Sequence, residues 1–446
     1  MGSASSPPEG DRVPAIQPFR GLRYASGPGA DLDRLTAPPY DVISEERRAA
    51  LAARHAHNIV HLDLPRPGTD GDAYRTAASL LQEWLRAGVL QREDRPSFYA
   101  CEQRYRAPSG EERTRRGFFG RLRLEPLDGG VVIPHERTLD RPRADRQRLL
   151  AATRTHLSAV FLLHPDPGHG VAGLLEEALR DDRLEQARDD EGTLSRVARI
   201  AGPLATADLV RRIEEARWAL IADGHHRYES ALAYRDERRA LGRRDAEHVL
   251  AFLCSLEDPG VAIFPIHRLV RSLEGFEPQK FSRRLGEFFR LTPVAGEEAL
   301  RAALAERRAR PGVFGFALRG APGFLLTEWK EGAGLELSGM APIPEPLRRL
   351  DVILLHRLVL EEILGISAEA QARQVNLDYV KDDRQWLGRM DQGGADIGIL
   401  MNPTRIEQVI AVTRKGLRLP QKSTYFHPKV LTGLVLDPLD DGGTVS

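Results

Sequence analysis

Residues 218–229 are WALIADGHHRYE, and the character of this stretch changes halfway along it. Its first five residues are apolar, as in a short buried strand, and Asp223-Gly224 follows as a turn. From His225 to about Ala240 the composition favours a helix. The pattern therefore predicts a strand, a tight turn and a helix, with Asp223 at the carboxyl end of the strand.

The predicted turn gathers groups that suit a phosphate. A helix N-terminus presents unpaired N–H groups and a partial positive charge, and His225, His226 and Arg227 add two imidazoles and a guanidinium there. Gly224 allows close backbone approach to a ligand, while Asp223 is suited to hold a metal, orient a histidine or bind a ribose hydroxyl. The structural alternative is an Asp223 helix cap with solvated histidines. We favour the functional interpretation, because this combination at a strand end is unusual.

Two further polar pairs lie beside ordered backbone. Pro38 and Pro39 fix an extended corner before Tyr40 and Asp41. His135 and Glu136 follow the apolar run Val-Val-Ile, so they also lie where a strand is expected to end. A carboxylate there suits a general base or a magnesium ligand, and a structural turn is the alternative.

Arginine supplies nearly all the positive charge, and three of the six lysines lie between residues 415 and 429. A lysine meets a phosphate as a compact point charge. Lys422, Ser423 and Thr424 combine such an ammonium with two hydroxyls, although the glycines of a Walker loop are missing. We therefore expect this loop to contact phosphate.

The totals exclude several classes of protein. Sixty-four basic residues balance 64 acidic ones, so no net field attracts nucleic acid or an anionic membrane. The two cysteines cannot build a disulfide framework. Neither an N-terminal signal core nor an apolar run near the roughly 20 residues of a membrane span is present. We expect a cytoplasmic enzyme or binding protein.

Strands and helices alternate along the chain, which predicts a mixed α/β protein of several domains. Residues 59–64 are expected to form a short strand, and most of the charge-dense run 140–146 is expected to be a solvated face. The expected organisation is a disordered tail, an N-terminal α/β region with a hairpin, a core with the Asp223 motif and a C-terminal α/β region with the Lys422 loop: 1–12, 13–125, 126–275 and 276–446.

Four motifs together resemble an uncharacterised bacterial and archaeal family, domain of unknown function 1015. They are the stretches APPYDVI, IPHERT, DGHHRYE and KSTYFHPK: residues 37–43, 133–138, 223–229 and 422–429. The resemblance covers about residues 15–435 and implies no activity by itself.

A more remote resemblance does imply an activity. The Pro-His-Glu strand end and the later Asp-Gly-His-His-Arg-Tyr are similar to the ParB/sulfiredoxin-like superfamily, especially its free L-serine kinases. The resemblance implies that Asp223, His225, His226 and Arg227 hold nucleotide phosphates and that Glu136 is the base. Here Glu136 and Asp223 lie 223 − 136 = 87 residues apart, which indicates a strand, a helix and another strand inserted between them.

These observations and the resemblance predict a small-molecule phosphotransferase. The best hypothesis is a nucleotide-dependent kinase of free L-serine or a similar hydroxylated metabolite. A phosphatase of a phospho-amino acid and a non-catalytic nucleotide-binding switch remain alternatives. We expect ATP or ADP and Mg²⁺ as cofactors, no nucleic-acid or membrane partner, and leave a homodimer open. The expected catalytic residues are Glu136, Asp223 and His226. The expected phosphate ligands are Gly224, His225, His226, Arg227, Lys422, Ser423 and Thr424, and the expected substrate contacts are Tyr40, Asp41 and His135.

Overall fold

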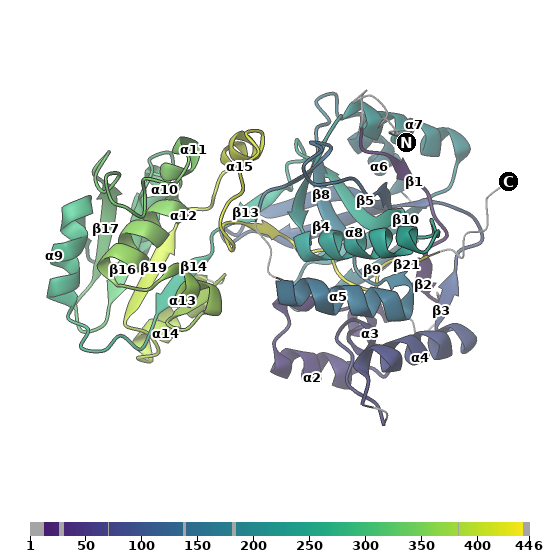
Figure 1. Ribbon diagram of the computed structural model, residues 1–446, viewed down its shortest axis with the longest axis horizontal. Coiled ribbons are helices and arrows are strands. Elements are labelled where there is room, and N and C mark those ends of the chain that lie inside the picture. Colours follow the sequence, from purple (N-terminus) through teal and green to yellow (C-terminus); the bar gives the residue numbers. More distant parts are fainter. Residues whose placement is uncertain are drawn as a thin grey trace, which may run out of the picture. The chain divides into compact units, whose positions relative to one another are not determined.

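The mixed α/β, multi-domain fold expected from the sequence is confirmed by a computed structural model (Figure 1). Its elements form two compact units. The first contains the chain up to Pro134, residues 138–262 and the segment from Pro428 onward, and the second contains His135 and Glu136 with residues 263–427. The structure describes residues 13–25, 31–69, 71–136, 140–180, 184–381 and 383–439.

A nine-stranded sheet is the centre of the first unit. Its strands follow the order β6-β11-β8-β12-β5-β4-β10-β9, with β1 also paired to β5. Neighbouring strands are antiparallel except for β6 with β11 and β8 with β12, which are parallel. The strands are β1 (Ile16–Gln17), β4 (Phe98–Arg106), β5 (Glu112–Arg123), β6 (Val132–Pro134), β8 (Val160–His164), β9 (Glu185–Arg188), β10 (Leu194–Ile200), β11 (Ala219–Asp223) and β12 (His248–Ser255).

Helices of this unit pack against the sheet. α4 packs on α5, and α5 packs on α8 (Figure 1). The helices are α1 (Leu32–Leu35), the 3-10 turn η1 (Tyr40–Val42), α2 (Glu45–Arg54), α3 (Val60–Asp63), α4 (Ala73–Arg86), α5 (Asp140–Thr153), α6 (Gly170–Ala178), α7 (Pro203–Glu215) and α8 (His225–Ala240). Two short strand pairs complete the unit: β2 (Leu22–Tyr24) with β3 (Leu90–Arg92), and β7 (Thr155–His156) with β21 (Asp437–Pro438).

The two faces of the sheet are covered differently, because side chains alternate along each strand. Phe118 and Leu162 point into the hydrophobic core, together with residues of α5, α6, α7 and α8. Arg115 and Phe161 belong to the alternate set and stack with the guanidinium 4.4 Å from the ring centre. Arg115 also donates to the Pro428 carbonyl, so the C-terminal segment lies on this second face.

Two expectations about this region are corrected. Residues 60–63 form helix α3 and not a strand. The N–H of Val60, the first residue of the helix, donates to Asn58 Oδ1 at 2.9 Å, which satisfies one of the groups that a helix start leaves without an intrahelical partner. β5 pairs with β12 within the first unit, and the four regions expected from the sequence stay a prediction. Arg146, from the run expected to be solvated, is buried in α5.

The second unit has a six-stranded sheet in the order β15-β17-β16-β19-β14-β18, with antiparallel pairing throughout. Its strands are β14 (His267–Val270), β15 (Phe289–Val294), β16 (Phe314–Leu318), β17 (Phe324–Trp329), β18 (Leu377–Val380) and β19 (Ile397–Met401), and β13 (Ala262–Phe264) pairs with β20 (Tyr425–His427). Its helices are α9 (Pro278–Phe288), α10 (Glu297–Glu306), α11 (Glu345–Arg348), α12 (Asp351–Leu354), the π-helix η2 (Leu355–Ile363), α13 (Ala368–Arg373), α14 (Asp383–Asp391) and α15 (Ile406–Thr413). Within the described ranges, none of the helices has the length and hydropathy that crossing a bilayer requires.

Candidate functional site

The predicted strand, turn and helix are present. β11 ends at Asp223, Gly224 turns the chain with φ of +89°, and the 16-residue helix α8 begins at His225. A side chain at Gly224 would be strained by this φ, and its Cβ would lie 2.9 Å from Nε of Arg227. Glycine therefore lets the Arg227 guanidinium lie over the start of the helix.

Asp223 sits between two cations. One carboxylate oxygen accepts from Nη2 of Arg227 at 2.7 Å, and the other accepts from the ammonium of Lys429. The three side chains are only 15%, 9% and 13% exposed for Asp223, Arg227 and Lys429, respectively. Burial raises the pKa of Asp223, but the charges of Lys429 and Arg227 outweigh it and hold that pKa well below its ordinary value. Asp223 therefore stays ionised and fixes both cations.

Arg227 is held at the start of the helix, but not all of its hydrogen-bond donors have a partner. Its Nη1 donates to the Ala159 carbonyl of the neighbouring chain segment. Its Nε is buried and has no hydrogen-bond partner among the residues described. A buried donor without an acceptor is costly, so this atom is suited to an anion that is bound from outside the chain.

Lys429 reaches Asp223 because the C-terminal segment is pinned to the sheet. The fully buried Arg115 donates to the Pro428 carbonyl at 2.6 Å, and Gln103 donates to the Lys429 carbonyl at 3.0 Å. Sequence reasoning did not assign Lys429 to the site. The available signals were its place in the KSTYFHPK motif and the scarcity of lysine.

Tyr40 belongs to a second charged group close to Arg227. The Arg146 guanidinium lies 4.3 Å from the Tyr40 ring centre and donates to Asp63 Oδ1 at 3.0 Å. Burial raises the pKa of Tyr40 to about 12, against the opposing charge of Arg227. Burial likewise raises the pKa of Asp63, against the charges of Arg146 and Arg227. Asp41 contributes charge to this group from an exposed position.

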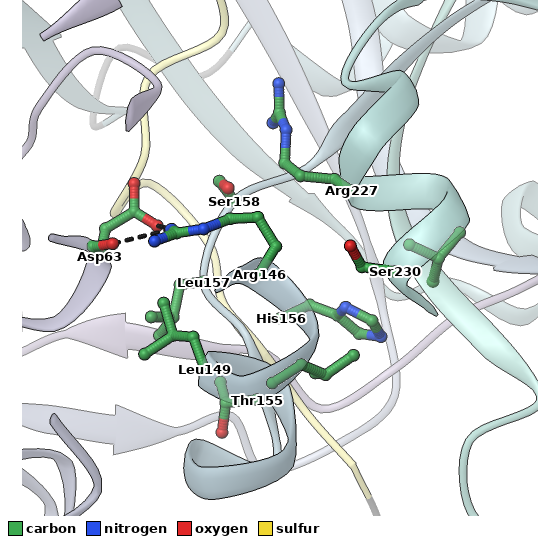
Figure 2. Close-up of a pocket in the computed structure, with 11 residues that line it drawn as sticks. Asp63, Arg146, Leu149, Thr155, His156, Leu157, Ser158, Arg227 and Ser230 are labelled. Carbon is green, nitrogen blue, oxygen red and sulfur yellow. Dashed lines mark hydrogen bonds and ion pairs between the residues drawn. The ribbon is translucent and has the colours of Figure 1, made fainter. Parts of the chain in front are cut away.

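A small cavity of about 40 Å³ joins these groups (Figure 2). Arg146 extends across it toward Asp63, Arg227 lines its edge from helix α8 with the guanidinium turned away from Arg146, and Ser158 and Ser230 add hydroxyls. The space holds about three water molecules. Asp63 and Arg146 were not predicted as site residues, since Asp63 was expected in a strand and Arg146 on a solvated face.

The remaining predicted residues lie in the second unit. Nε2 of the buried His135 lies 2.7 Å from the Thr424 hydroxyl, in a hydrogen bond. The Lys422 N–H donates to Glu136 Oε1 at 3.2 Å, and Ser423 donates its hydroxyl to the Pro420 carbonyl. The structure therefore joins the predicted base and the predicted phosphate loop directly.

Lys422 has the left-handed φ of +58°, which is unfavourable for a side-chain-bearing residue. Its peptide groups are held on both sides, because its carbonyl accepts from Nη2 of the buried Arg268 at 3.1 Å. Arg268 also contacts His356 of the π-helix η2, with Nη2 3.4 Å from the imidazole Nε2. Sequence reasoning found neither residue.

The site residues thus form two groups, one in each unit. Asp223, Gly224, His225, His226 and Arg227 share the first unit with Tyr40 and Asp41, whereas His135, Glu136, Lys422, Ser423 and Thr424 share the second. The roles assigned to all twelve stay predictions.

The two expected cofactors fit the described residues to different degrees. The orphaned Arg227 Nε, the Lys429 ammonium and the start of α8 suit nucleotide phosphates. No group of three or more His, Cys, Asp or Glu residues suited to a metal occurs in the part of the chain that is described. Asp223 is already bound by two cations, so these residues do not form a dedicated magnesium site.

Comparisons with solved structures give distant likenesses. A conserved hypothetical protein from Pyrococcus furiosus is 14% identical with a TM-score of 0.33, over 70% of this chain and 90% of that one. A free serine kinase variant in complex with ADP is 13% identical with a TM-score of 0.34, over 70% and 87%. Truncated SbnI from Staphylococcus aureus is 12% identical with a TM-score of 0.35, over 71% and 87%. Function must therefore be argued from the residues of this chain.

No curated protein matches the chain. One family model does, that of the proteins of unknown function named DUF1015, and it matches residues 16–353. This match spans well over half of the sequence and contains three of the four motifs, while the fourth, residues 422–429, lies beyond it. The chain belongs to the DUF1015 family.

Proposed function

We propose that this protein is a small-molecule phosphotransferase, specifically a nucleotide-dependent kinase of free L-serine or a similar hydroxylated metabolite. The observation that carries the proposal is the Asp223–Arg227–Lys429 cluster at the start of α8, with its orphaned guanidinium donor. The motif resemblance to free L-serine kinases supports the same reaction.

The charge of the cluster suits a phosphate. One carboxylate and two cations leave one net positive charge, and the helix adds a partial positive charge at the same end. Asp223 keeps Arg227 and Lys429 close together before any ligand arrives. Such preorganised charge stabilises a transferring phosphoryl group without further rearrangement, which is the main contribution of proteins to this chemistry.

The chain's other residues have distinct tasks in this proposal. Gly224 lets the Arg227 guanidinium lie over the start of α8, and His225 and His226 add donors in the same turn. In the transfer, the acceptor hydroxyl oxygen forms a bond to the terminal phosphorus. The bond from that phosphorus to the bridging nucleotide oxygen breaks, and the bridging oxygen keeps the electron pair. The hydroxyl proton passes to a carboxylate, for which Glu136 is our candidate.

Mg²⁺ commonly binds through one or two carboxylates and the substrate phosphates. A Mg²⁺ ion bound to the nucleotide would neutralise phosphate charge in this proposal. The protein's own part is to bind and orient the nucleotide through the Arg227 and Lys429 cations.

Phosphorus NMR of purified protein with ATP or ADP, Mg²⁺ and a set of hydroxylated compounds tests the proposal. A kinase converts the terminal phosphate signal into a new phosphomonoester signal, with L-serine expected among the acceptors. Release of inorganic phosphate from O-phosphoserine without nucleotide would instead indicate the phosphatase. Nucleotide binding with no turnover on any acceptor would indicate the switch protein and refute the kinase.

A further inference from the structure

A second cavity, of about 230 Å³, lies in the first unit between the starts of helices α2 and α4 and the middle of α5. Pockets for drug-sized ligands usually enclose roughly 300–1,000 Å³. This cavity is therefore small for a whole nucleotide and matches a small metabolite.

Its lining carries charge of both signs. Three guanidinium groups, from Arg48, Arg66 and Arg146, face the two carboxylates of Glu45 and Asp145. The lining therefore has one net positive charge. An anionic group that carries a single negative charge, such as a carboxylate, would neutralise it.

Arg48 is the cation that has no acidic partner. Its Nε donates to the Leu64 carbonyl at 2.8 Å, which fixes the side chain along the cavity wall. Its two terminal nitrogens have no hydrogen-bond or ion-pair partner among the described residues. Burial lowers the pKa of Arg48 below its ordinary value. By contrast, Arg66 pairs with Glu45.

One wall of the cavity, formed by Tyr74, Asp145 and Arg146, lies close to the Asp223 motif. Tyr74 donates its hydroxyl to Asp145 Oδ1 at 2.8 Å, and Arg146 donates to Asp145 Oδ2 at 2.6 Å. Arg146 also lines the small cavity that Arg227 lines (Figure 2). The Arg146 side chain therefore lines both the larger cavity and the small cavity beside the Asp223 motif.

We propose that this cavity binds the carboxylate of a small hydroxylated metabolite through Arg48, and that it is the acceptor pocket of the phosphotransferase. The pocket assignment rests on the proposed function, whereas carboxylate binding does not. The Arg48 terminal nitrogens receive the carboxylate, and Asp145 and Tyr74 face the rest of the molecule.

Calorimetric titrations without nucleotide test the binding step. The probes are L-serine, glycerate, serinol, which lacks the carboxylate, and inorganic phosphate, each at millimolar concentration. The variants are Arg48→Gln and, as the matched control, Arg47→Gln. Arg47 is also half-buried in α2 but lies near Asp190, at 3.6 Å, and does not line the cavity.

L-serine or glycerate should bind the wild type and Arg47→Gln alike, and Arg48→Gln should weaken binding at least about tenfold, the scale of a lost charge-assisted hydrogen bond. Serinol should bind far more weakly. Equal binding by both variants, serinol binding as well as L-serine, preferential phosphate binding, or no carboxylate binding would each overturn the proposal.

The two proposals fail in different ways. If the carboxylate binds through Arg48 but phosphorus NMR shows no transfer, the phosphotransferase is wrong and the binding site stands. If transfer occurs and the acceptor KM is equal in Arg48→Gln and Arg47→Gln, the phosphotransferase stands and this pocket is wrong.

Discussion

Replacement of Asp223 by asparagine removes the charge that holds the cluster together while keeping the shape of the side chain. Arg227 and Lys429 then remain as two neighbouring, nearly buried cations. Removing one partner of a buried ion pair costs about 3–5 kcal/mol. Because asparagine still accepts one hydrogen bond, we expect the free energy of unfolding to fall by about 2–4 kcal/mol.

The same charge makes stability depend on pH. The pKa of Asp223 is depressed in the folded protein, so the carboxylate contributes its full stability above the unfolded pKa of about 3.9. As the pH falls below that value toward the depressed folded pKa, the contribution is lost. The wild-type advantage over Asp223→Asn should therefore shrink below about pH 4 and be constant at neutral pH.

Asp245 offers a matched control in the same unit. It is 7% exposed and also bridges two cations, at 2.5 Å from Arg238 and 2.9 Å from Arg154. Hydrogen bonding to Arg238, opposed by burial and helped by Arg154, lowers its pKa to about 2. Asp245→Asn should also lower the free energy of unfolding, because it too leaves two cations without their shared carboxylate.

The urea dependence of hydrogen exchange in peptides from β11 and α8 measures how much free energy of unfolding Asp223→Asn and Asp245→Asn each lose. Inorganic phosphate should restore stability to Asp223→Asn, whose two cations lack a counter-charge, more than to Asp245→Asn. If Asp223→Asn lowers the free energy of unfolding by less than about 1 kcal/mol, the claim that Asp223 forms a strongly stabilising buried ion pair is refuted. An equal response of both variants to phosphate would refute anion binding at the cluster.

Gly224→Ala should destabilise α8 and weaken nucleotide binding more than Gly242→Ala, because both have positive φ but only the first new Cβ meets Arg227; equal effects in unfolding and titration experiments would show that backbone strain alone matters. Arg115→Met should lower nucleotide affinity and speed hydrogen exchange around Lys429, whose preceding carbonyl it holds; unchanged exchange would contradict this role. Glu136→Gln should leave nucleotide binding nearly normal and slow transfer by about a hundredfold or more, the scale of a lost general base; full activity would remove it from the mechanism.

Local patterns predicted the elements that carry the site. The apolar run before Asp223 and the Asp-Gly pair were sufficient to place β11, its turn and α8, because these features are set by neighbouring residues. By contrast, residues 59–64 were expected to form a strand, whereas residues 60–63 form helix α3, and its first N–H, that of Val60, donates to Asn58 Oδ1.

Long-range packing could not be predicted in this way. Lys429 meets Asp223 across 206 residues only because Arg115 and Gln103 bind the backbone of the C-terminal segment. Arg146 looked like a surface residue because its neighbours in sequence are charged. Its partners Asp63 and Tyr40 come from a distant part of the chain.

The most direct test of the central claim is a calorimetric titration of ATP and ADP into wild type, Arg227→Gln and Arg235→Gln. Arg235 lies on the same helix and, like Arg227, binds one carboxylate and one main-chain carbonyl, those of Asp236 and Leu124. If the start of α8 holds nucleotide phosphates, Arg227→Gln should weaken binding by about 1.5–3 kcal/mol while Arg235→Gln leaves it unchanged. Equal affinities in all three proteins, or no nucleotide binding by the wild type, would contradict the claim.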